Sequence, residues 1–456
     1  MTPTSKASRP DRVYVWTWLP GSPDPVPAGV ARQRGDLVTF AYGRSYLERR
    51  DSISLFTPEL PLGPDRIDPT GLLTMPGCLR DGAPDSWGRR VIESRLGVGE
   101  NSLTELEYML ESGTNRFGAI DFQESSNTYV PRVDHAGLDE LHGAAAQLSA
   151  GIPLAPSLSE ALVHGTSIGG ARPKVLVTDK EGDQWIAKLS AASDLFSVVN
   201  AEATALILAR AAGLDVPDTH VTRSLARDVL LVRRFDRPAP DQRRHVVSGL
   251  TLAGENELGA RYVTYPTLLD VLRQQGADPS SAGPQLFERI VFNIAIGNSD
   301  DHARNHAAFW DGKHLELTPA YDLAPGNRSG ETAFQAMSID RKGTRTSTFG
   351  TCLAAGHIYG LSASQARDVV DRVVTAIQDG WADAAEQARL SQFDRERLWA
   401  RQFLNPAASY DLPKVLAVPA RRPGRGPVRG NTTPGSTAGS FAPRTLDETD
   451  PRARKP

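Results

Sequence analysis

The sequence predicts an α+β protein in which a small β-sheet lobe packs against a larger helical lobe, with a cleft between the two. Three observations predict this fold class. Strand-like segments precede the long helical ones, two adjacent glycines come before the first clear hairpin, and 40% of the 456 residues are apolar, enough for a large core. At about 150 residues per domain, this length corresponds to roughly three domains or subdomains.

The first part of the chain predicts a small β-rich subdomain. Alternating apolar residues indicate strands at 13–18 and 36–42, and the segments around them are rich in proline and glycine, which favours turns. Helical periodicity then favours helices at 86–96 and 103–112.

The next part predicts the sheet lobe. Lys174–Asp179 and Gln184–Leu189 alternate in polarity and are joined by a short segment that contains a glycine, which indicates a hairpin. Asn200 is a good N-cap for a helix that ends at Gly213. A further strand is expected at 228–235.

The chain then becomes helical. Segments 266–276 and 284–297 each have proline near the start and glycine at the end. Ser362 and Gln365 form a capping-box pattern before the apolar segment 369–377. We therefore expect an all-helical second lobe.

Composition excludes several classes of protein. Fifty-one Lys and Arg against 54 Asp and Glu leave a formal net charge of −3, so the whole chain is not a polycation that binds nucleic-acid phosphates. Cys78 and Cys352 match no zinc or redox spacing, which excludes a disulfide scaffold and a cysteine-ligated metal. The sequence shows no signal-peptide core and no run of about 18 apolar residues, so we expect a cytoplasmic protein without a membrane segment.

The strongest chemical signal is the octapeptide Asn298–Asn305, which directly follows an apolar helix. Asp300, Asn305 five residues later and Asp322 after a short predicted strand form a pattern that phosphoryl transfer needs. One carboxylate accepts the proton of the nucleophile, while the amide and the second carboxylate hold Mg²⁺ against phosphates. The alternative is a polar surface turn followed by an unrelated aspartate.

A possible phosphate loop lies upstream, in Ser167-Ile168-Gly169-Gly170 and the following residues to Lys174. Adjacent glycines let backbone amides approach anionic oxygens, and the neighbouring serine and lysine suit phosphate. The segment is neither a Walker A loop nor GxGxxG, so it is weak support by itself.

Lys188 lies among apolar residues of a predicted strand. It is either a charge on an edge strand or a buried cation with a partner. Glu202, near the start of the following helix, is the candidate partner, in a lysine–glutamate pair that holds the phosphates of ATP. Residues 230–236 then form either the hinge between the lobes, with Phe235 lining an adenine pocket, or a core strand with exposed arginines.

In chain order, these parts follow the plan of a bilobal protein kinase, and the sequence resembles the HipA family, the Ser/Thr kinase toxins of bacterial type II toxin–antitoxin systems. The matching segments are 79–87, 115–119, 167–174, 186–189, 200–202, 234–237, 298–305 and 319–322. The resemblance implies a protein-kinase-like fold of four regions. These are an N-terminal subdomain (1–135), a sheet N-lobe with the glycine loop and hinge (136–240), a helical C-lobe with the catalytic loop (241–410) and a tail (411–456).

The tail differs in composition from the rest of the chain. It holds eight Pro, five Gly and nine Lys or Arg against four Asp or Glu, with a single aromatic residue. Such a segment buries too little apolar surface to order itself, so we expect a disordered tail. Its positive charge either contacts nucleic acid or an acidic partner, or is simply solvated.

The resemblance assigns roles to individual residues. Asp300 is the expected catalytic base, Asn305 and Asp322 are the expected Mg²⁺ ligands, and Lys188 is expected to contact the α- and β-phosphates. The expected ATP-binding residues are Ser167, Ile168, Gly169, Gly170, Lys174, Lys188, Glu202, Arg233 and Phe235.

Three further expectations concern single residues. Ser167 occupies the place of a serine whose autophosphorylation ejects the loop, since about two added negative charges repel the phosphates of the nucleotide. Arg233 replaces an acidic hinge residue of better-known members, which affects contacts to adenine more than the use of ATP. His302 in the catalytic loop either touches the transferred phosphate or braces the loop.

The resemblance also implies partners. These are a protein substrate, for example an aminoacyl-tRNA synthetase, and a helix-turn-helix antitoxin through which any contact with DNA is indirect. Two alternative functions remain, a small-molecule phosphotransferase and a catalytically idle binding protein. The N-terminal match argues against the first, and the complete set of competent residues argues against the second.

Overall fold

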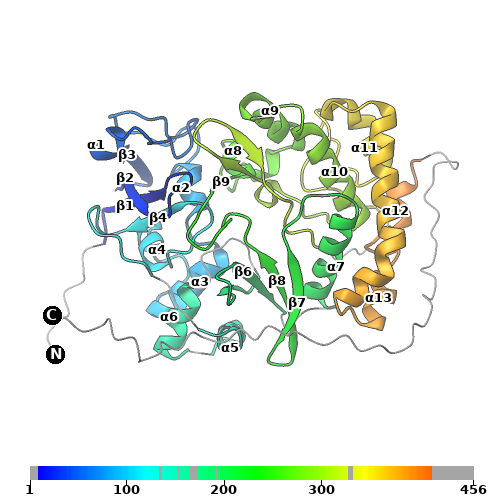
Figure 1. Ribbon diagram of the computed structural model, residues 1–456, viewed down its shortest axis with the longest axis horizontal. Coiled ribbons are helices and arrows are strands. Elements are labelled where there is room, and N and C mark those ends of the chain that lie inside the picture. Colours follow the sequence, from blue (N-terminus) through cyan, green and yellow to red (C-terminus); the bar gives the residue numbers. More distant parts are fainter. Residues whose placement is uncertain are drawn as a thin grey trace.

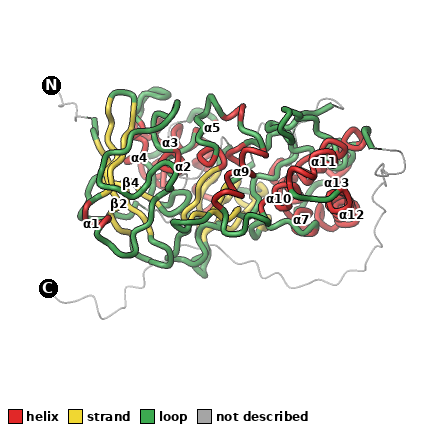
Figure 2. The backbone as a smooth tube through the Cα atoms, turned by 90° about the horizontal axis from the view of Figure 1, so that it is seen from above, coloured by secondary structure: helices red, strands yellow, loops and turns green. Residues whose placement is uncertain are grey.

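The structure is a computed structural model that describes residues 9–132, 136–152, 154–164, 172–190, 194, 196–326 and 332–412. The predicted loop residues Ser167, Ile168, Gly169 and Gly170 lie outside the described residues, and so does the tail from residue 413 onward. Figure 1 shows an N-terminal sheet with its helices on the left, a second sheet in the middle and a group of helices on the right. Viewed from above, these helices gather at the end of the molecule opposite the N-terminal sheet (Figure 2).

The N-terminal sheet has four antiparallel strands in the order β3-β2-β1-β4. The strands are β1 (Arg12–Trp18), β2 (Pro25–Arg34), β3 (Leu37–Tyr42) and β4 (Ile120–Gln123). β2 corrects the prediction of turns between 18 and 36. Pro25 and Pro27 lie at the start of β2, which pairs there with β1 alone because β3 pairs with β2 only from Gly29 onward. Proline, which has no N–H to donate, is tolerated where one side of a strand is unpaired. A Cβ atom at Gly29 would lie 2.3 Å from the carbonyl oxygen of Ala41, so glycine is required there.

Among the described residues before β5, six segments are helical. They are α1 (Arg44–Leu47), α2 (Gly77–Asp81), α3 (Ser86–Leu96), α4 (Glu105–Glu111), α5 (Leu138–Ser149) and α6 (Pro156–His164). The predicted helix at 86–96 is confirmed at both ends, and the one predicted at 103–112 is shorter. Trp87 and Val91 of α3 share a buried cluster with Val175 and Ala187 of the second sheet. The hydrophobic core therefore extends from the N-terminal region into the sheet lobe.

The second sheet has four antiparallel strands in the order β5-β6-β8-β7. The strands are β5 (Lys174–Thr178), β6 (Gln184–Leu189), β7 (Thr219–Ser224) and β8 (Arg227–Arg233). The predicted hairpin is confirmed as β5–β6. Helix α7 (Val198–Ala211) packs against β8 on the other face of this sheet.

The predicted N-cap role of Asn200 is wrong. Ser197 is the N-cap residue of α7, and Asn200 is buried inside the helix. Its amide donates to the Asp228 carboxylate at 3.0 Å and to the carbonyl oxygen of Ala388 at 2.7 Å. A buried polar side chain must find hydrogen-bond partners, and here they come from distant segments that a capping rule does not consider.

The third region is mainly helical. They are α8 (Gly249–Leu252), α9 (Tyr265–Gln275), α10 (Ala282–Ala295), α11 (Phe349–Ala355), α12 (Ala363–Gln387) and α13 (Gln392–Leu398), with 3₁₀ turns at Ala260–Tyr262, Ala303–Asn305, Gly356–Tyr359 and Pro406–Ser409. The predicted capping box of Ser362 and Gln365 is confirmed at the start of α12. Along the described residues, no helix combines the length and apolarity that a bilayer crossing requires.

The prediction of an all-helical lobe needs one correction. Three short antiparallel strands form a small sheet in the order β11-β10-β9. The strands are β9 (His245–Ser248), β10 (Ala307–Trp310) and β11 (Leu315–Leu317). Every residue of β9 and β10 is buried, so neither strand shows the alternation of polar and apolar residues by which a strand is recognised.

Candidate active site

A triad of charged residues, Lys188, Glu202 and Asp322, forms the centre of the candidate active site. Lys188 comes from β6, Glu202 from the second turn of α7 and Asp322 from the loop after β11. The Nζ of Lys188 donates to a carboxylate oxygen of Glu202 and lies 2.8 Å from Oδ1 of Asp322. The predicted pair of strand lysine and helix glutamate is therefore present. It also meets an aspartate 134 positions further along the chain.

The charges of the triad depend on one another. The ammonium of Lys188 lowers the pKa of Asp322 to about 2, against the opposing effect of burial. Burial lowers the pKa of Lys188, but Asp322 and Glu202 outweigh it and hold this pKa above its ordinary value. Lys188 and Asp322 are both charged at neutral pH as a result. A cation and a carboxylate side by side are what the phosphates of a nucleotide and their metal ion need.

Asp322 adopts an uncommon backbone conformation. Its φ of +58° lies in the left-handed region, which aspartate enters more readily than most residues. The amide of Asn298 donates to the carbonyl oxygen of Asp322 at 3.4 Å, and Leu323 beside it is buried. These contacts hold the loop, while 47% of the Asp322 side chain stays exposed.

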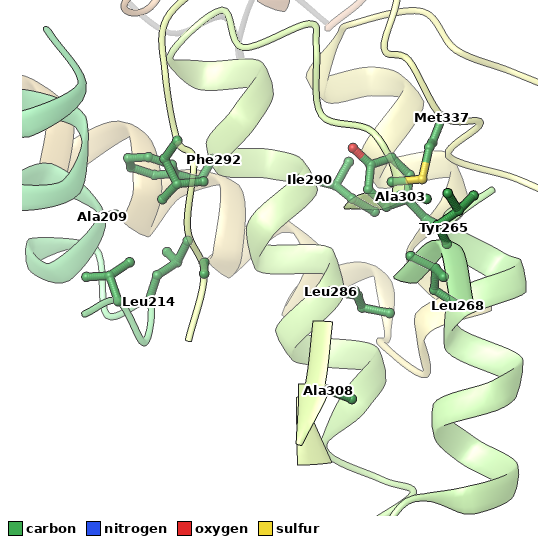
Figure 3. Packing of buried hydrophobic residues seen from close by; sticks show 14 of the residues in the cluster. Ala209, Leu214, Tyr265, Leu268, Leu286, Ile290, Phe292, Ala303, Ala308 and Met337 are labelled. Carbon is green, nitrogen blue, oxygen red and sulfur yellow. The ribbon is translucent and has the colours of Figure 1, made fainter. Parts of the chain in front are cut away.

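The predicted catalytic loop follows the end of α10. Asp300 is exposed, whereas Asn305 is buried and its amide nitrogen donates to the carbonyl oxygen of Asp300 at 3.2 Å. Ala303, between them, lies in the hydrophobic core, and Figure 3 shows it close to Ile290 and Tyr265. The loop is therefore anchored by its middle residue, and Asp300 remains open to a substrate.

Asp301 has a structural role that sequence reasoning missed. It is buried, and its carboxylate accepts hydrogen bonds from the Tyr265 hydroxyl at 2.6 Å and the Asn293 amide at 2.8 Å. Nε2 of His306 lies 3.0 Å from the same carboxylate, and Asn293 also accepts a hydrogen bond from Asn298. Asp301 thus ties α9 and α10 to the loop. Two adjacent aspartates carry no local signal of which one is buried.

Lys174, predicted to bind ATP, lies directly opposite Lys188 in the β5–β6 ladder. Its Nζ is 3.4 Å from Oδ2 of Asp85, the N-cap residue of α3, and both side chains are 8% exposed. Burial lowers the pKa of Lys174, and the Asp85 carboxylate opposes this lowering. Because it pairs with Lys188, Lys174 lies at the same end of the site as the triad.

Phe235 lies at the predicted hinge, in an aromatic cluster. Its ring centroid is 5.6 Å from that of Tyr321 and 5.9 Å from that of Phe117. Tyr321 precedes Asp322, so the cluster links the end of β8 to the loop of the triad. Arg233 is directed elsewhere, to ion pairs of the sheet with Asp183 at 2.8 Å and Asp218 at 3.8 Å.

A buried network of charges lies at the end of β8. Arg234 and Arg237 enclose Asp236, at 2.7 Å and 2.9 Å from the same carboxylate oxygen. Both arginines donate to the carbonyl oxygen of Arg116, and the N–H of Gly118 donates to Asp236. Burial raises the pKa of Asp236, but the two arginines outweigh it and lower this pKa to about 2. The N-terminal subdomain is thereby joined to the segment predicted as the hinge.

Two predictions concern contacts with ligands, namely a contact of His302 with the transferred phosphate and the binding of Mg²⁺. His302 lies near enough to Asp322 to help lower its pKa, and its buried Nδ1 has no hydrogen-bond partner among the described residues. The part of the chain that the structure describes holds no cluster of three His, Cys, Asp or Glu side chains that would bind a metal alone. Asp322 and Asn305 carry carboxylate and amide oxygens, the ligand types that Mg²⁺ prefers beside phosphates, and their joint role as metal ligands stays a prediction.

Models of two protein domains match the chain. The HipA N-terminal domain matches residues 24–123, and the HipA-like C-terminal domain matches residues 166–381. Together they cover more than half of the sequence and include the whole triad. The chain belongs to the HipA family.

Curated relatives of this HipA-family protein include proteins with kinase names. Y4dM of Sinorhizobium fredii is 26% identical over 308 residues, which are 62% of this chain and 71% of that protein. The serine/threonine-protein kinase toxin HipA of Shewanella oneidensis is 27% identical over 168 residues, 32% of this chain and 39% of that protein. Y4mE, also of Sinorhizobium fredii, is 28% identical over 130 residues, and the match spans only 31% of that protein.

A solved structure has the same fold. A chain of the complex of HipA, HipB and operator DNA from Shewanella oneidensis matches with a TM-score of 0.62 and 16% identity, over 87% of this chain and 99% of that chain. The predicted bilobal, HipA-like α+β fold is therefore confirmed.

Proposed function

We propose that this HipA-family protein is an ATP-dependent serine/threonine protein kinase that acts as the toxin of a type II toxin–antitoxin system. The observation that carries the proposal is the meeting of Lys188 and Glu202 of the sheet lobe with Asp322 of the helical lobe, at 2.8 Å between Lys188 and Asp322. This arrangement of a strand lysine, a helix glutamate and a second-lobe aspartate is the one that protein kinases use to hold phosphates and metal. The kinase names of the curated relatives support the same activity.

Each residue of the site has a role in this proposal. Lys188 binds α- and β-phosphate oxygens, and Asp322 and Asn305 hold the metal ion. ATP would supply the γ-phosphoryl group, and the Mg²⁺ bound with it would offset the negative charge of the transferred oxygens. Asp300 accepts the proton of the substrate hydroxyl while that oxygen bonds to the γ-phosphorus. The bond from this phosphorus to the bridging oxygen breaks, and ADP leaves.

The partners belong to the proposal as well. We expect a Ser or Thr of a translation-related protein as the acceptor, for example in an aminoacyl-tRNA synthetase. We also expect a helix-turn-helix antitoxin that carries the contact with operator DNA. The fold match to a chain of a HipA, HipB and operator DNA complex supports this antitoxin.

The test compares the wild type with Asp300→Asn and with Asp270→Asn, a change of an exposed aspartate paired with Arg341. Each purified protein is incubated with radiolabelled Mg-ATP and cell lysate. We expect labelled protein bands with the wild type and Asp270→Asn, and none with Asp300→Asn. Label in metabolites alone would indicate a small-molecule phosphotransferase, and no label at all would indicate a binding protein. Phosphoproteomics after brief expression of the active and inactive forms then identifies the acceptor.

We also propose that the protein silences itself by autophosphorylation at Ser167, and this part of the proposal has its own test. Ser167→Ala removes the acceptor hydroxyl, so this variant should keep phosphorylating its target during preincubation with Mg-ATP, whereas the wild type loses activity. Equal time courses of inactivation in the two proteins would contradict this part of the proposal.

A further inference from the structure

The two lysines of the candidate site form ion pairs with carboxylates from different parts of the chain. Lys174 and Lys188 are opposite each other in the antiparallel ladder, so their Cβ atoms are about 5 Å apart and their charges repel. The positive charge of Lys188 is balanced by Glu202 of the sheet lobe and by Asp322 of the helical lobe. The carboxylate beside Lys174 is Asp85, which belongs to the N-terminal subdomain.

Asp85 is held in position independently of Lys174. Its Oδ1 accepts a hydrogen bond from the N–H of Gly88 at 2.7 Å, because it caps α3, and its Oδ2 faces the lysine. Trp87 and Val91 anchor the same helix in the core that includes residues of β5 and β6. The carboxylate therefore has little freedom to move relative to the strand that carries Lys174.

A buried ammonium requires such a partner. With 8% of its side chain exposed, Lys174 has little water to solvate its charge, and removing the acid of a buried ion pair is costly. Lys174 is opposite Lys188 in the ladder, and Nζ of Lys188 lies 2.8 Å from Asp322, so Lys174 lies at the phosphate end of the site.

We propose that Asp85 is a positioning residue of the nucleotide site, through which the N-terminal subdomain holds the ammonium of Lys174 where it binds the phosphates of ATP. This inference rests on the proposed function, because it requires that the site binds Mg-ATP. Asp85 itself does not touch the nucleotide and acts through Lys174. The N-terminal subdomain is accordingly a part of the nucleotide site in addition to its other contacts.

The test uses Asp85→Asn in the full chain, because asparagine caps a helix as well as aspartate does but carries no charge. Loss of one charge-assisted contact should raise the KM for Mg-ATP, and the Kd measured by calorimetry, about tenfold, with kcat within about twofold. Asp85→Ser, which also keeps a capping oxygen, should behave in the same way. Urea unfolding checks that both variants are folded at the assay temperature.

A double-mutant cycle separates positioning from a general structural effect. In a Lys174→Met background, Asp85→Asn should change the KM by less than about twofold, because the lysine through which it acts is gone. Glu105→Gln removes one negative charge from the Arg89–Glu105 pair of the same subdomain and should leave the KM unchanged.

The results that would contradict the inference can be told apart from those that would contradict the proposed function. A wild type that does not bind Mg-ATP would overturn both. A wild type that binds, together with an Asp85→Asn variant of equal affinity or one whose effect persists fully without Lys174, would overturn the inference alone.

Discussion

The triad of the candidate site and the buried network after β8, here called the phosphate end and the hinge end, have similar side chains in very different surroundings. At the phosphate end, Lys188 meets an Asp322 side chain that is 47% exposed. At the hinge end, Arg234 and Arg237 enclose Asp236, and none of the three side chains is more than 3% exposed. Partly solvated charges can exchange partners at low cost, whereas a fully buried network is costly to open. We infer that charges at the phosphate end serve the reaction and that those at the hinge end hold the subdomains together.

The largest effect is expected at the phosphate end, in activity. Asp322→Asn should reduce phosphotransfer about 10³-fold, equivalent to about 4 kcal/mol, because it removes the charge that we propose holds the metal ion. The free energy of unfolding should change by less than about 1 kcal/mol, since the side chain is half exposed. Kinase assays and urea unfolding of the same protein measure both quantities. A loss of stability of several kcal/mol would remove the distinction between the two ends.

The hinge end should show the reverse pattern, with its main effect on stability. Asp236→Asn leaves two buried arginines without their carboxylate and should lower the free energy of unfolding by about 3 kcal/mol or more. Asp183→Asn, which breaks the more exposed pair with Arg233, is the matched control and should cost less than about 1 kcal/mol. Equal losses in the two variants would show that burial does not determine the cost here.

Acid should weaken the hinge end over a defined pH range. The folded pKa of Asp236 is about 2, below its ordinary value of 3.8, so its ion pairs stabilise the folded state above about pH 4. This contribution, about 2 kcal/mol, is lost as the pH falls from about 4 to about 2. Urea unfolding at several pH values should show that Asp236→Asn loses less stability than the wild type over this range. Parallel pH profiles would contradict the assignment.

The smallest effect is expected far from both ends. Ser362→Ala removes the capping box of α12 and should cost about 1 kcal/mol of unfolding free energy, with unchanged phosphotransfer. This variant calibrates the other measurements, because it destabilises a helix without altering a charge of the site. A fall in activity with this variant would show that the assay reports stability rather than chemistry.

Local rules predicted the parts of the structure that neighbouring residues decide. The hairpin β5–β6, the helix α3 and the capping box of Ser362 depend on segments of about ten residues, and each is confirmed. The same rules failed where a partner is distant. Asn200 resembles an N-cap residue but bonds across 188 positions to the carbonyl oxygen of Ala388, inside its helix.

In the candidate site, too, a contact between nearby segments was predicted from the sequence, whereas a contact between distant segments was not. A lysine in an apolar strand followed by a glutamate in the next helix indicated the Lys188–Glu202 pair, because a buried cation requires an acid. The partner of Lys174 had no such signal. Asp85 lies 89 positions upstream in another subdomain, and sequence reasoning treated it only as part of a family motif.

The amino-acid sequence alone determined which chemical groups this protein has, and with them its family, its main helices and hairpin and the set of candidate site residues. Only the tertiary structure decided which of these groups are buried and which meet. Asp300 and Asp301 illustrate the difference, since they are adjacent and chemically identical, yet one is open to solvent and the other accepts hydrogen bonds from two helices. The physical reason is that burial and ion pairing depend on segments brought together from all parts of the chain, whereas helix, turn and capping preferences depend on near neighbours.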